Sequence, residues 1–343
     1  MSANPRYQQD GMRLNSGLTQ FASDLIMLPQ NFVANIIAPP IAVPSLHGFY
    51  RVMDRSAALS TAQDTTVAKG ESPKVFDKHT AKAPFETGRD ALKYLLSDDE
   101  EMGSDMEAVD FLKDMTEMAN VFAAKREIVL ANLILNAGSY GDASQIIAVT
   151  AGNEWDDSTS KPSIDVDRAK RIVKEISGYN ANTLLVPDLV YKALWRNDEV
   201  QKFNVGFLEG RTMLLEGQLP SFRLFGLNVV NADAINNAVG PLQGTSLGYL
   251  WENISPYFGS WAWIGYVDPI PSQKTGSFAS QFAFRPARIA GASTDPLFGM
   301  IRVLEYYDPD VEGTYYAVRS NTGLKVTNDK AGALITGVTT ATS

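Results

Sequence analysis

Apolar residues recur with helical spacing over a long stretch in the first half of the chain. No Pro or Gly interrupts residues 105 to 136, and most residues there are good helix formers. Ser104 and Glu107 fit the S-x-x-E capping box, and Gly138 stands where a left-handed C-cap is favoured. The pattern predicts a helical rod of roughly 48 Å. One apolar stripe follows the i, i+3, i+4 positions, at Ala108, Phe111 or Leu112, Met115, Met118 or Ala119, and Phe122.

The last turns of this helix are apolar nearly all round. Ile128 to Leu130 and Leu133 to Leu135 leave no polar face there. A helix that is apolar on every side is normally buried. We therefore expect this end of the rod to lie inside the protein.

A long polar stretch, Ser56 to Lys82, precedes the rod. It is neither helix-periodic nor continuously apolar, and turn residues stand at Gly70 and Pro73 within it and at Pro84 just after it. With the strand-like run Phe49 to Leu59 before it, the stretch predicts a hairpin with a polar tip. Such a hairpin is marginal alone and needs a neighbour.

The N-terminal region is patterned as an arm. It begins polar, continues with a short helical piece from Leu18 to Leu28, and then becomes extended and interrupted by Pro. Asp98 to Glu101 form an acidic run just before the rod. Two interpretations of that run stay open: a solvated loop, or electrostatic contact with a neighbouring subunit.

After a polar region, helix and strand patterns alternate. Ile164 to Ser177 is amphipathic, with Asp165 expected as its cap and Gly178 as its stop. Thr183 to Val186 is a short buried strand ending at Pro187. Asp188 is expected to cap the following helix.

The last part of the chain is rich in strand patterns. RLFGLNVVN (Arg223 to Asn231) predicts strands, and so does the region from Met300 to Val338. These strands must join a sheet built elsewhere, so the fold class is α+β.

Composition narrows the function. The chain has 343 residues, 45% of them hydrophobic, no cysteine and a formal charge of -9. Disulfides and thiolate chemistry are therefore excluded, and a reducing cytoplasm fits. An acidic chain is unlike a dedicated nucleic-acid binder, which carries a basic face. No apolar run approaches the ~18 residues of a membrane span, and no secretory signal is visible, so no membrane partner is expected.

No catalytic, cofactor or metal motif emerges. His47 and His79 stand in no zinc pattern and have no visible catalytic partner, so both are interpreted as solvent or interface residues. The run from Asp308 to Gly313 begins like a calcium loop, but Arg319 replaces the bidentate Glu at the twelfth position. It is interpreted as a turn between strands. We expect no catalytic residue, no cofactor and no metal.

The order of elements resembles the major capsid proteins of tailed bacteriophages of the Hong Kong 97 fold type. The segments that carry the resemblance are TTVAKGESPK (65–74), similar to the extended E-loop; 108–142, ending ANLILNAGSYGD, similar to the spine helix; NANTLLVPDLVYKAL (180–194), similar to the axial domain; and FRLFGLNVVNADAI with GTSLGYLWENIS, similar to later strands. The chain departs from the family at Asn228, where Pro is frequent, and at Lys69, where an acidic residue is common.

The resemblance implies that the chain divides into an N-terminal arm (1–45), a hairpin (46–95), a peripheral unit (96–150 with 300–343) and an axial unit (151–299). It also implies a function in assembly. Subunits would form hexamers and pentamers of an icosahedral shell around double-stranded DNA, enclosed without sequence-specific binding. It implies a virion protein that is assembled in the host cytoplasm. A separate scaffolding protein is expected, and portal and head-decoration proteins are further partners. Placement along the chain gives the candidate assembly contacts Arg51, Lys69, Glu71, Lys74, Asp77, Trp251 and Tyr257.

Three alternatives stay open. An encapsulin-type nanocompartment has the same fold but encloses enzymes. A soluble α/β enzyme built on residues 164–231 would need a pocket with converging polar groups. A tail-tube or other virion structural protein is the third.

Overall fold

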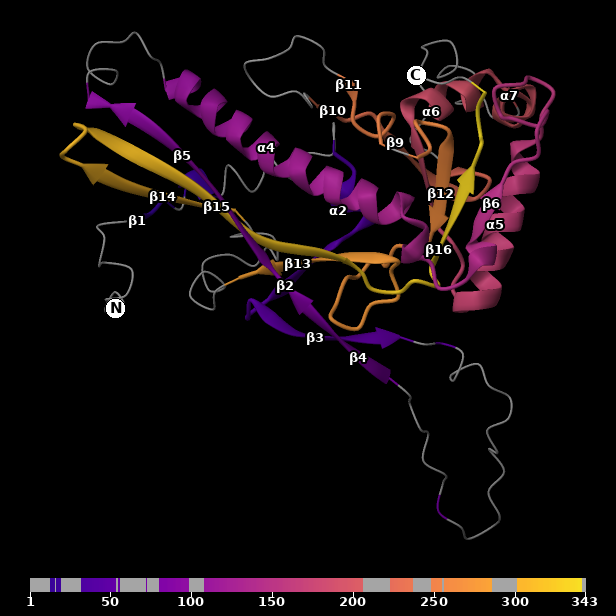
Figure 1. The fold of residues 1–343 in the computed structure, drawn as a ribbon, viewed down its shortest axis with the longest axis horizontal. Coiled ribbons are helices and arrows are strands. Elements are labelled where there is room, and N and C mark those ends of the chain that lie inside the picture. The colour runs from indigo at the N-terminus through magenta and orange to yellow at the C-terminus, as the bar shows by residue number, and fades with distance from the viewer. Residues whose placement is uncertain are drawn as a thin grey trace.

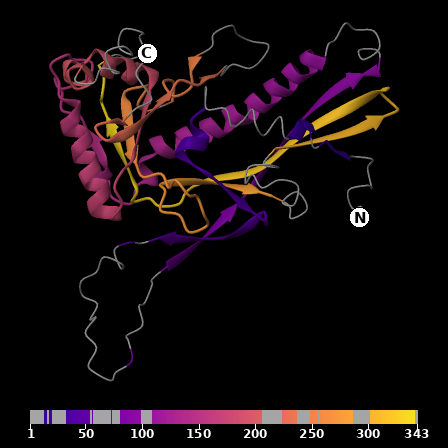
Figure 2. The ribbon, with the colours of Figure 1, turned by 180° about the vertical axis from the view of Figure 1, so that it is seen from behind.

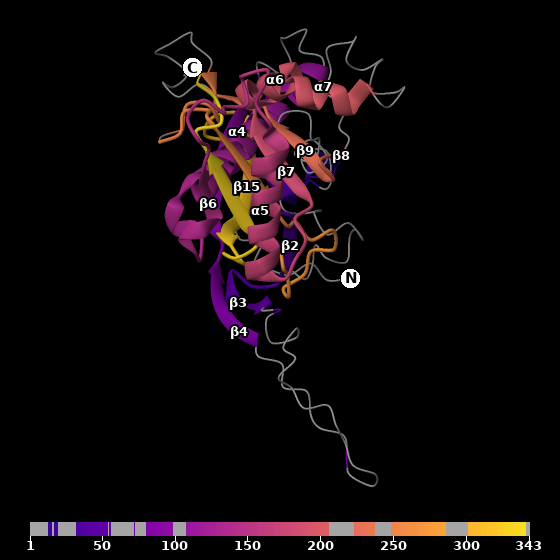
Figure 3. The same cartoon turned by 90° about the vertical axis from the view of Figure 1, so that its right-hand side faces the viewer.

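The computed structural model describes residues 13–15, 17–19, 32–53, 55, 72, 80–98, 108–205, 223–236, 248–254, 256–285 and 301–340. Two sheets lie side by side, and the helix α4 (Ala108–Leu135) runs from one to the other (Figure 1). The view in Figure 3, turned by a quarter, is much narrower, so the molecule is flat.

The first sheet, here called the peripheral sheet, is organised around one long strand. β15 (Gly313–Val326) pairs with β14 and β5 along its first part and with β13 along its last part. The sheet has the order β1-β14-β15-β13-β2, with β5 joined to β15. Its other strands are β1 (Arg13–Leu14), β2 (Pro40–Val43), β5 (Gly88–Ser97), β13 (Ala279–Phe284) and β14 (Ile301–Asp308).

The helix α4 covers one face of the peripheral sheet with the predicted apolar stripe. Met115, Ala119 and Phe122 are buried against the sheet residues Ile301, Val303 and Val318. Burial of such side chains contributes about 1.5–3 kcal/mol each. The i, i+3, i+4 spacing therefore faces the core as predicted.

The second sheet, here called the axial sheet, has the order β6-β16-β12-β7-β9-β8. Every residue of β7 and β12 is buried, which explains why both strands are continuously apolar or small. Its strands are β6 (Ile146–Ala148), β7 (Thr183–Pro187), β8 (Arg223–Leu224), β9 (Leu227–Ala232), β12 (Trp261–Gly265) and β16 (Gly332–Thr336).

Helices pack on the axial sheet, and α5 lies against its face in Figure 3. The helices here are α5 (Pro162–Ser177), α6 (Asp188–Arg196) and α7 (Asp198–Val205). The short helix α2 (Ala34–Ile37) packs on α4. A small ribbon of β10 (Ile235–Asn236) and β11 (Gly248–Tyr249) lies at the same upper edge as α6 (Figure 1), and 3-10 turns η2 (Ala137–Ser139) and η3 (Ala143–Gln145) follow α4.

A separate hairpin of β3 (His47–Met53) and β4 (Thr80–Glu86) leaves the molecule at the edge opposite α4 (Figures 1 and 2). Its inner face is anchored in a small core. The ring of Phe282 lies 4.4 Å from that of Phe85 and 5.4 Å from that of Tyr50. The base of the hairpin is thus fixed to the peripheral sheet.

Sheet membership differs from the expected divisions of the chain. Residues 88–95 were assigned to the hairpin but belong to β5 (Gly88–Ser97) of the peripheral sheet. Residues 332–336 were assigned to the peripheral unit but form β16 of the axial sheet, while residues 279–284 join the peripheral one. The described end of the N-terminal arm is also part of the subunit core, where Val33, Ile37 and Ile41 are buried. Pairing between strands far apart in sequence decides these assignments.

Several predicted helix ends need correction. Lys161, not Asp165, precedes α5, and Pro162 takes its first position. Asp165 instead accepts a hydrogen bond from Trp155 Nε1 at 3.1 Å. Asp188 is the first residue of α6, preceded by Pro187. Gly178 does adopt the left-handed C-cap, with φ 71°, as predicted.

The end of α4 also differs from the prediction. Gly138 lies in η2 rather than in a left-handed cap, and its N–H donates to the side chain of Asn136. Ile128 and Val129 are exposed, while Leu130 and Ile134 are buried, so the apolar end is only half covered. The capping box at Ser104 and most of the helix predicted from Leu18 lie outside the described residues.

The acidic turn between strands is confirmed. Asp308 ends β14 and Gly313 begins β15, so strands rather than helices flank it. A calcium loop of the helix-loop-helix type is therefore wrong for this segment.

Candidate functional site

The β3–β4 hairpin presents one uncovered face. Side chains alternate along a strand, so Tyr50 and Phe85 face inward while Phe49 and Arg51 face outward. Phe49 is 66% exposed, which is unusual for a large aromatic side chain in a described strand. This outward face is defined by Phe49, Arg51, Lys82 and Pro84.

Two cations stand opposite each other on the outward face. Arg51 pairs in register with Lys82, and Phe49 pairs with Pro84. Both cations are exposed, and neither makes an ion pair with a described residue. Like charges directly opposite are unfavourable. The hairpin keeps its place because the Arg51 N–H donates to Gln273 O at 2.9 Å and Lys325 Nζ donates to Pro84 O at 2.9 Å.

A buried carboxylate joins three distant segments of the chain. Glu127 lies on α4 and is 0% exposed. Its oxygens accept hydrogen bonds from Val33 N at 3.1 Å and Ala34 N at 2.9 Å, at the start of α2. Trp251 Nε1 donates a third bond at 2.8 Å. The carboxylate thereby connects the N-terminal segment, α4 and the segment after β11.

Burial dominates the electrostatics of this junction. Desolvation raises the pKa of Glu127 to about 7, against the lowering effects of its three donors and of Arg126. Desolvation likewise lowers the pKa of Arg126 to about 10. Arg126 also approaches α2, since its Nη1 lies 3.5 Å from Asn35 Oδ1. Both neighbours on α4 therefore hold α2.

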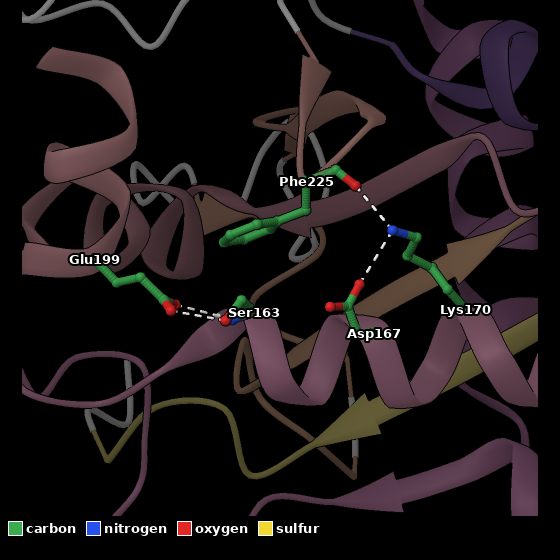
Figure 4. A network of polar contacts seen from close by, with 5 residues as sticks. All are labelled: Ser163, Asp167, Lys170, Glu199 and Phe225. Carbon is green, nitrogen blue, oxygen red and sulfur yellow. Dashed lines mark hydrogen bonds and ion pairs between the residues drawn. The ribbon is translucent and has the colours of Figure 1, made fainter. Parts of the chain in front are cut away.

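A polar network fixes the helices of the axial unit (Figure 4). Glu199 of α7 accepts bonds from Ser163 N at 3.0 Å and Ser163 Oγ at 2.7 Å at the start of α5. Lys170 Nζ contacts Asp167 Oδ1 at 3.1 Å and the carbonyl of Phe225 at 3.0 Å. Phe225 and Gly226 both have positive φ, as the tight turn between β8 and β9 requires. These contacts join α5 to α7 and to the turn between β8 and β9.

A groove of about 400 Å³ lies between α4, α6 and the β10–β11 ribbon, at the edge opposite the hairpin. Phe32, Asn120, Asp188, Lys192, Asp233, Ile235 and Tyr249 line this α4–α6 groove. Asp188 forms an ion pair with Lys192 at 2.5 Å. Burial and the charge of Asp188 raise the pKa of Asp233. Ile235 is 52% exposed at the rim.

The structure separates the predicted contact residues. Arg51 is exposed on the outward face. Trp251 is 0% exposed, packs against Trp261 with ring centroids 5.4 Å apart, and cannot meet a neighbouring subunit. The prediction of an assembly contact there is wrong, because the core needs that side chain. Tyr257 is partly buried and lines a hollow with Asn132 and Pro256. Lys69, Glu71, Lys74 and Asp77 lie outside the described residues.

Sequence reasoning missed Glu127, Phe49, Lys82 and Asp233. A charged pair inside an otherwise apolar helix end was a visible signal for Glu127. Phe49 and Lys82 became notable only through their register across the hairpin.

No metal or membrane element is found in what the structure describes. No group of three or more His, Cys, Asp or Glu side chains among these residues is placed to hold a metal ion. His47 is exposed, and its Nδ1 lies 3.9 Å from Glu86; His79 lies outside the described part. No helix within the described ranges is long and apolar enough to cross a membrane.

No protein-family model and no curated protein matches this sequence. Solved structures do match. A phage-related protein from Bordetella bronchiseptica RB50 has a TM-score of 0.66 at 17% identity, covering 96% of this chain and 99% of that one. The capsid of cyanophage P-SCSP1u has a TM-score of 0.52 at 12% sequence identity, covering 88% of this chain and 86% of that one. The virus-like particle from Pyrococcus furiosus has a TM-score of 0.50 at 10% sequence identity, covering 93% of this chain and 97% of that one.

These likenesses show the fold. The chain has the Hong Kong 97-type phage capsid fold, and its α+β class is confirmed. The similarity spans nearly the whole chain in each case, so both sheets and α4 belong to one architecture.

Proposed function

We propose that this chain is the major capsid protein of a tailed phage. Its copies form hexamers and pentamers that close into an icosahedral shell around double-stranded DNA. The protein resides in the virion and is assembled in the host cytoplasm. Residues 1–45 act as an arm and the β3–β4 hairpin as the base of the E-loop. The peripheral sheet and α4 form the peripheral domain, and the axial sheet lies towards the symmetry axis.

One observation carries the proposal: a capsid fold from which a hairpin projects with an exposed aromatic side chain, Phe49, on its outward face. Phe49 gains nothing from exposure to water, and none of the described residues of its own subunit covers it. An exposed face on a projecting element suits a subunit of a larger assembly.

Charge suits an enclosed genome. A shell of subunits with a formal charge of -9 does not grip phosphates through counterion release. DNA can then be packed and ejected without being bound tightly. A separate scaffolding protein would set curvature, and portal and head-decoration proteins would complete the head.

An encapsulin-type nanocompartment is the second candidate. The observation that favours it is the match to the virus-like particle from Pyrococcus furiosus, which extends over 97% of that chain. The two candidates differ in cargo. A phage head holds DNA, whereas a nanocompartment holds enzymes.

A role as an enzyme has less support. The α4–α6 groove contains Asp188, Lys192 and Asp233, but Asp188 and Lys192 neutralise each other as an ion pair. A nucleophile with an adjacent base is not present among the residues lining that groove. We assign no catalytic residue and no cofactor.

Negative-stain electron microscopy of the protein expressed alone tests the proposal. Closed shells, tubes or hexameric sheets are expected, and co-expression with the neighbouring genes supplies a scaffold if one is required. Nuclease-protected DNA in the particles distinguishes a phage head from a nanocompartment, which would contain a co-purifying enzyme. Uniform small particles under both expression conditions would contradict an assembly function.

A deletion tests the E-loop assignment. Removing residues 60–72 should leave a folded, soluble subunit that forms no shells, because the polar tip contributes to neighbours rather than to the subunit core. Replacing the same residues with a Gly-Ser segment of equal length controls for the hairpin connection. Normal shells from the deletion would contradict the assignment.

A further inference from the structure

In the described part of the subunit, the side chains of Phe49, Arg51, Lys82 and Pro84 on the outward face of the hairpin are exposed. The inner face is already filled by Phe282, so the hairpin cannot turn over to bury Phe49. Arg51 and Lys82 repel each other across the strands. An anionic, partly apolar surface would relieve both the exposure of Phe49 and the repulsion between the cations.

The α4–α6 groove has the complementary character. Ile235 and Tyr249 form an exposed apolar rim, and Phe32 lines the interior. An aromatic side chain fits a recess of about 400 Å³. The groove therefore matches the apolar part of the hairpin face.

The charge of the groove is negative. Lys192 is the one cation lining it among the described residues, and it is paired with Asp188. Asp233 forms no ion pair with a described residue, and Glu252 accepts a hydrogen bond from Leu189 N, at the start of α6, at 2.9 Å. Burial chiefly raises the pKa of both Asp233 and Glu252, and repulsion by the charge of Asp188 adds a smaller increase. A cation entering from outside would relieve this repulsion.

We propose that the outward face of the β3–β4 hairpin docks in the α4–α6 groove of a second copy of this chain, with Phe49 against Ile235 and Tyr249, and Arg51 and Lys82 facing Asp233. The proposal rests on the proposed assembly function and names the two surfaces that meet.

The positions of the two surfaces make the contact head-to-tail. The hairpin lies at one edge of the flat molecule, and β10, β11 and α6 lie at the other (Figures 1 and 2). A copy that binds through its hairpin still has a free groove, so addition continues until a ring closes. A subunit cannot dock its hairpin in its own α4–α6 groove, because the two surfaces lie at opposite edges and face opposite ways.

Cross-linking tests the contact directly. The chain has no cysteine, so introduced cysteines are the only thiols. Pro84→Cys on the outward face and Ile235→Cys at the groove rim keep Phe49, Arg51 and Asp233 in place. Treating the full-length double variant with a short bis-maleimide should give a ladder of covalent dimers, trimers and larger species on a denaturing gel.

Controls separate this contact from chance collisions. Each single-cysteine variant can form dimers at most. The matched pair Pro84→Cys with Glu175→Cys places the second thiol on the exposed surface of α5 and should give no ladder. A ladder no stronger than that of this control overturns the docking. If microscopy shows shells but cross-linking gives no ladder, the docking contact is contradicted and the proposed function stands. If there are no shells and no ladder, both the contact and the proposed function are contradicted.

A charge exchange gives an independent readout. Arg51→Glu and Asp233→Arg should each lower the yield of assembled particles roughly tenfold or more, since like charges then meet at the contact. The chain carrying both changes should recover much of the yield, with unfolding temperatures of the subunits unchanged throughout. A double variant that assembles no better than the single variants overturns the pairing.

Discussion

The indole of Trp251 donates a hydrogen bond of 2.8 Å to the carboxylate of Glu127 inside the core. The two residues are 124 positions apart in the chain, and the same carboxylate also holds the start of α2. A single buried group thus ties α4 to the N-terminal segment and to the segment after β11.

Replacing Trp251 should destabilise the subunit itself. Trp251→Ala removes a fully buried indole and leaves Glu127 with one donor fewer, which costs about 3–5 kcal/mol. Chemical denaturation of the unassembled subunit measures the change. Phe49→Ala, which removes an exposed ring, should leave that stability within about 0.5 kcal/mol. Equal losses for the two variants would contradict the assignment of Trp251 to the core.

Glu127 should make stability depend on pH. Its pKa is about 7 in the folded chain against an ordinary 4.5, so the folded state keeps a proton that the unfolded state releases. The contribution of this group is therefore greatest at low pH and is lost as pH rises through about 7. Relative to Glu127→Gln, the free energy of unfolding of the natural chain should fall by on the order of 3 kcal/mol between about pH 5 and pH 8.

The control for this titration lies on the same helix. Glu117 is exposed, so Glu117→Gln should leave the pH dependence unchanged. Denaturant titrations of the three proteins across the pH range give the comparison. Parallel curves for the natural chain and Glu127→Gln would show that Glu127 does not titrate in this range.

A methyl group at Gly323 should displace the base of the hairpin. A Cβ there would lie 2.0 Å from the carbonyl oxygen of Glu86, a backbone atom that can move only with the bend between β4 and β5. Gly323→Ala should therefore cost more stability than Gly152→Ala. Gly152 has φ +86° but nothing within 4 Å, so its change costs only about 1 kcal/mol of backbone strain. Thermal unfolding of both variants measures the difference, and equal decreases in their unfolding temperatures would contradict the steric argument.

Glu199 should stabilise the start of α5. Glu199→Ala removes both acceptors of Ser163 and leaves a helix N-terminal N–H uncapped, which costs about 1–2 kcal/mol. Glu175→Ala, on α5 itself, breaks only the exposed ion pair with Arg171 and should cost less than about 0.5 kcal/mol. Unfolding in denaturant measures the loss of stability in both variants. A loss for Glu199→Ala as small as that for Glu175→Ala would show that the contact in Figure 4 contributes little to stability.

Local patterns predicted the elements well where the prediction depended only on residues within one element. The apolar stripe at Met115, Ala119 and Phe122, the stop at Gly178 and the buried strand from Thr183 all appear as expected. The helix ends were predicted less well. Asp165 bonds to Trp155 instead of capping, because a tertiary contact competes with a local one for the same carboxylate.

The candidate site could be predicted only in part. Arg51 was singled out by its position before the polar stretch and is exposed as expected of a contact residue. Trp251 was misplaced, because an aromatic residue favours cores and interfaces alike and only packing separates them. Lys82 and Asp233 gave no sequence signal, since an isolated surface charge resembles any other.

The sequence by itself determined the helices α4, α5 and α6, the strand-rich regions, the α+β class and the order of elements that resembles a capsid protein, because these depend on spacing between near neighbours. The tertiary structure decided which sheet each strand joins, that Glu127 lies buried between three segments, and that Arg51 stands opposite Lys82. Those features depend on register and burial between residues far apart in the chain, and no local pattern specifies them.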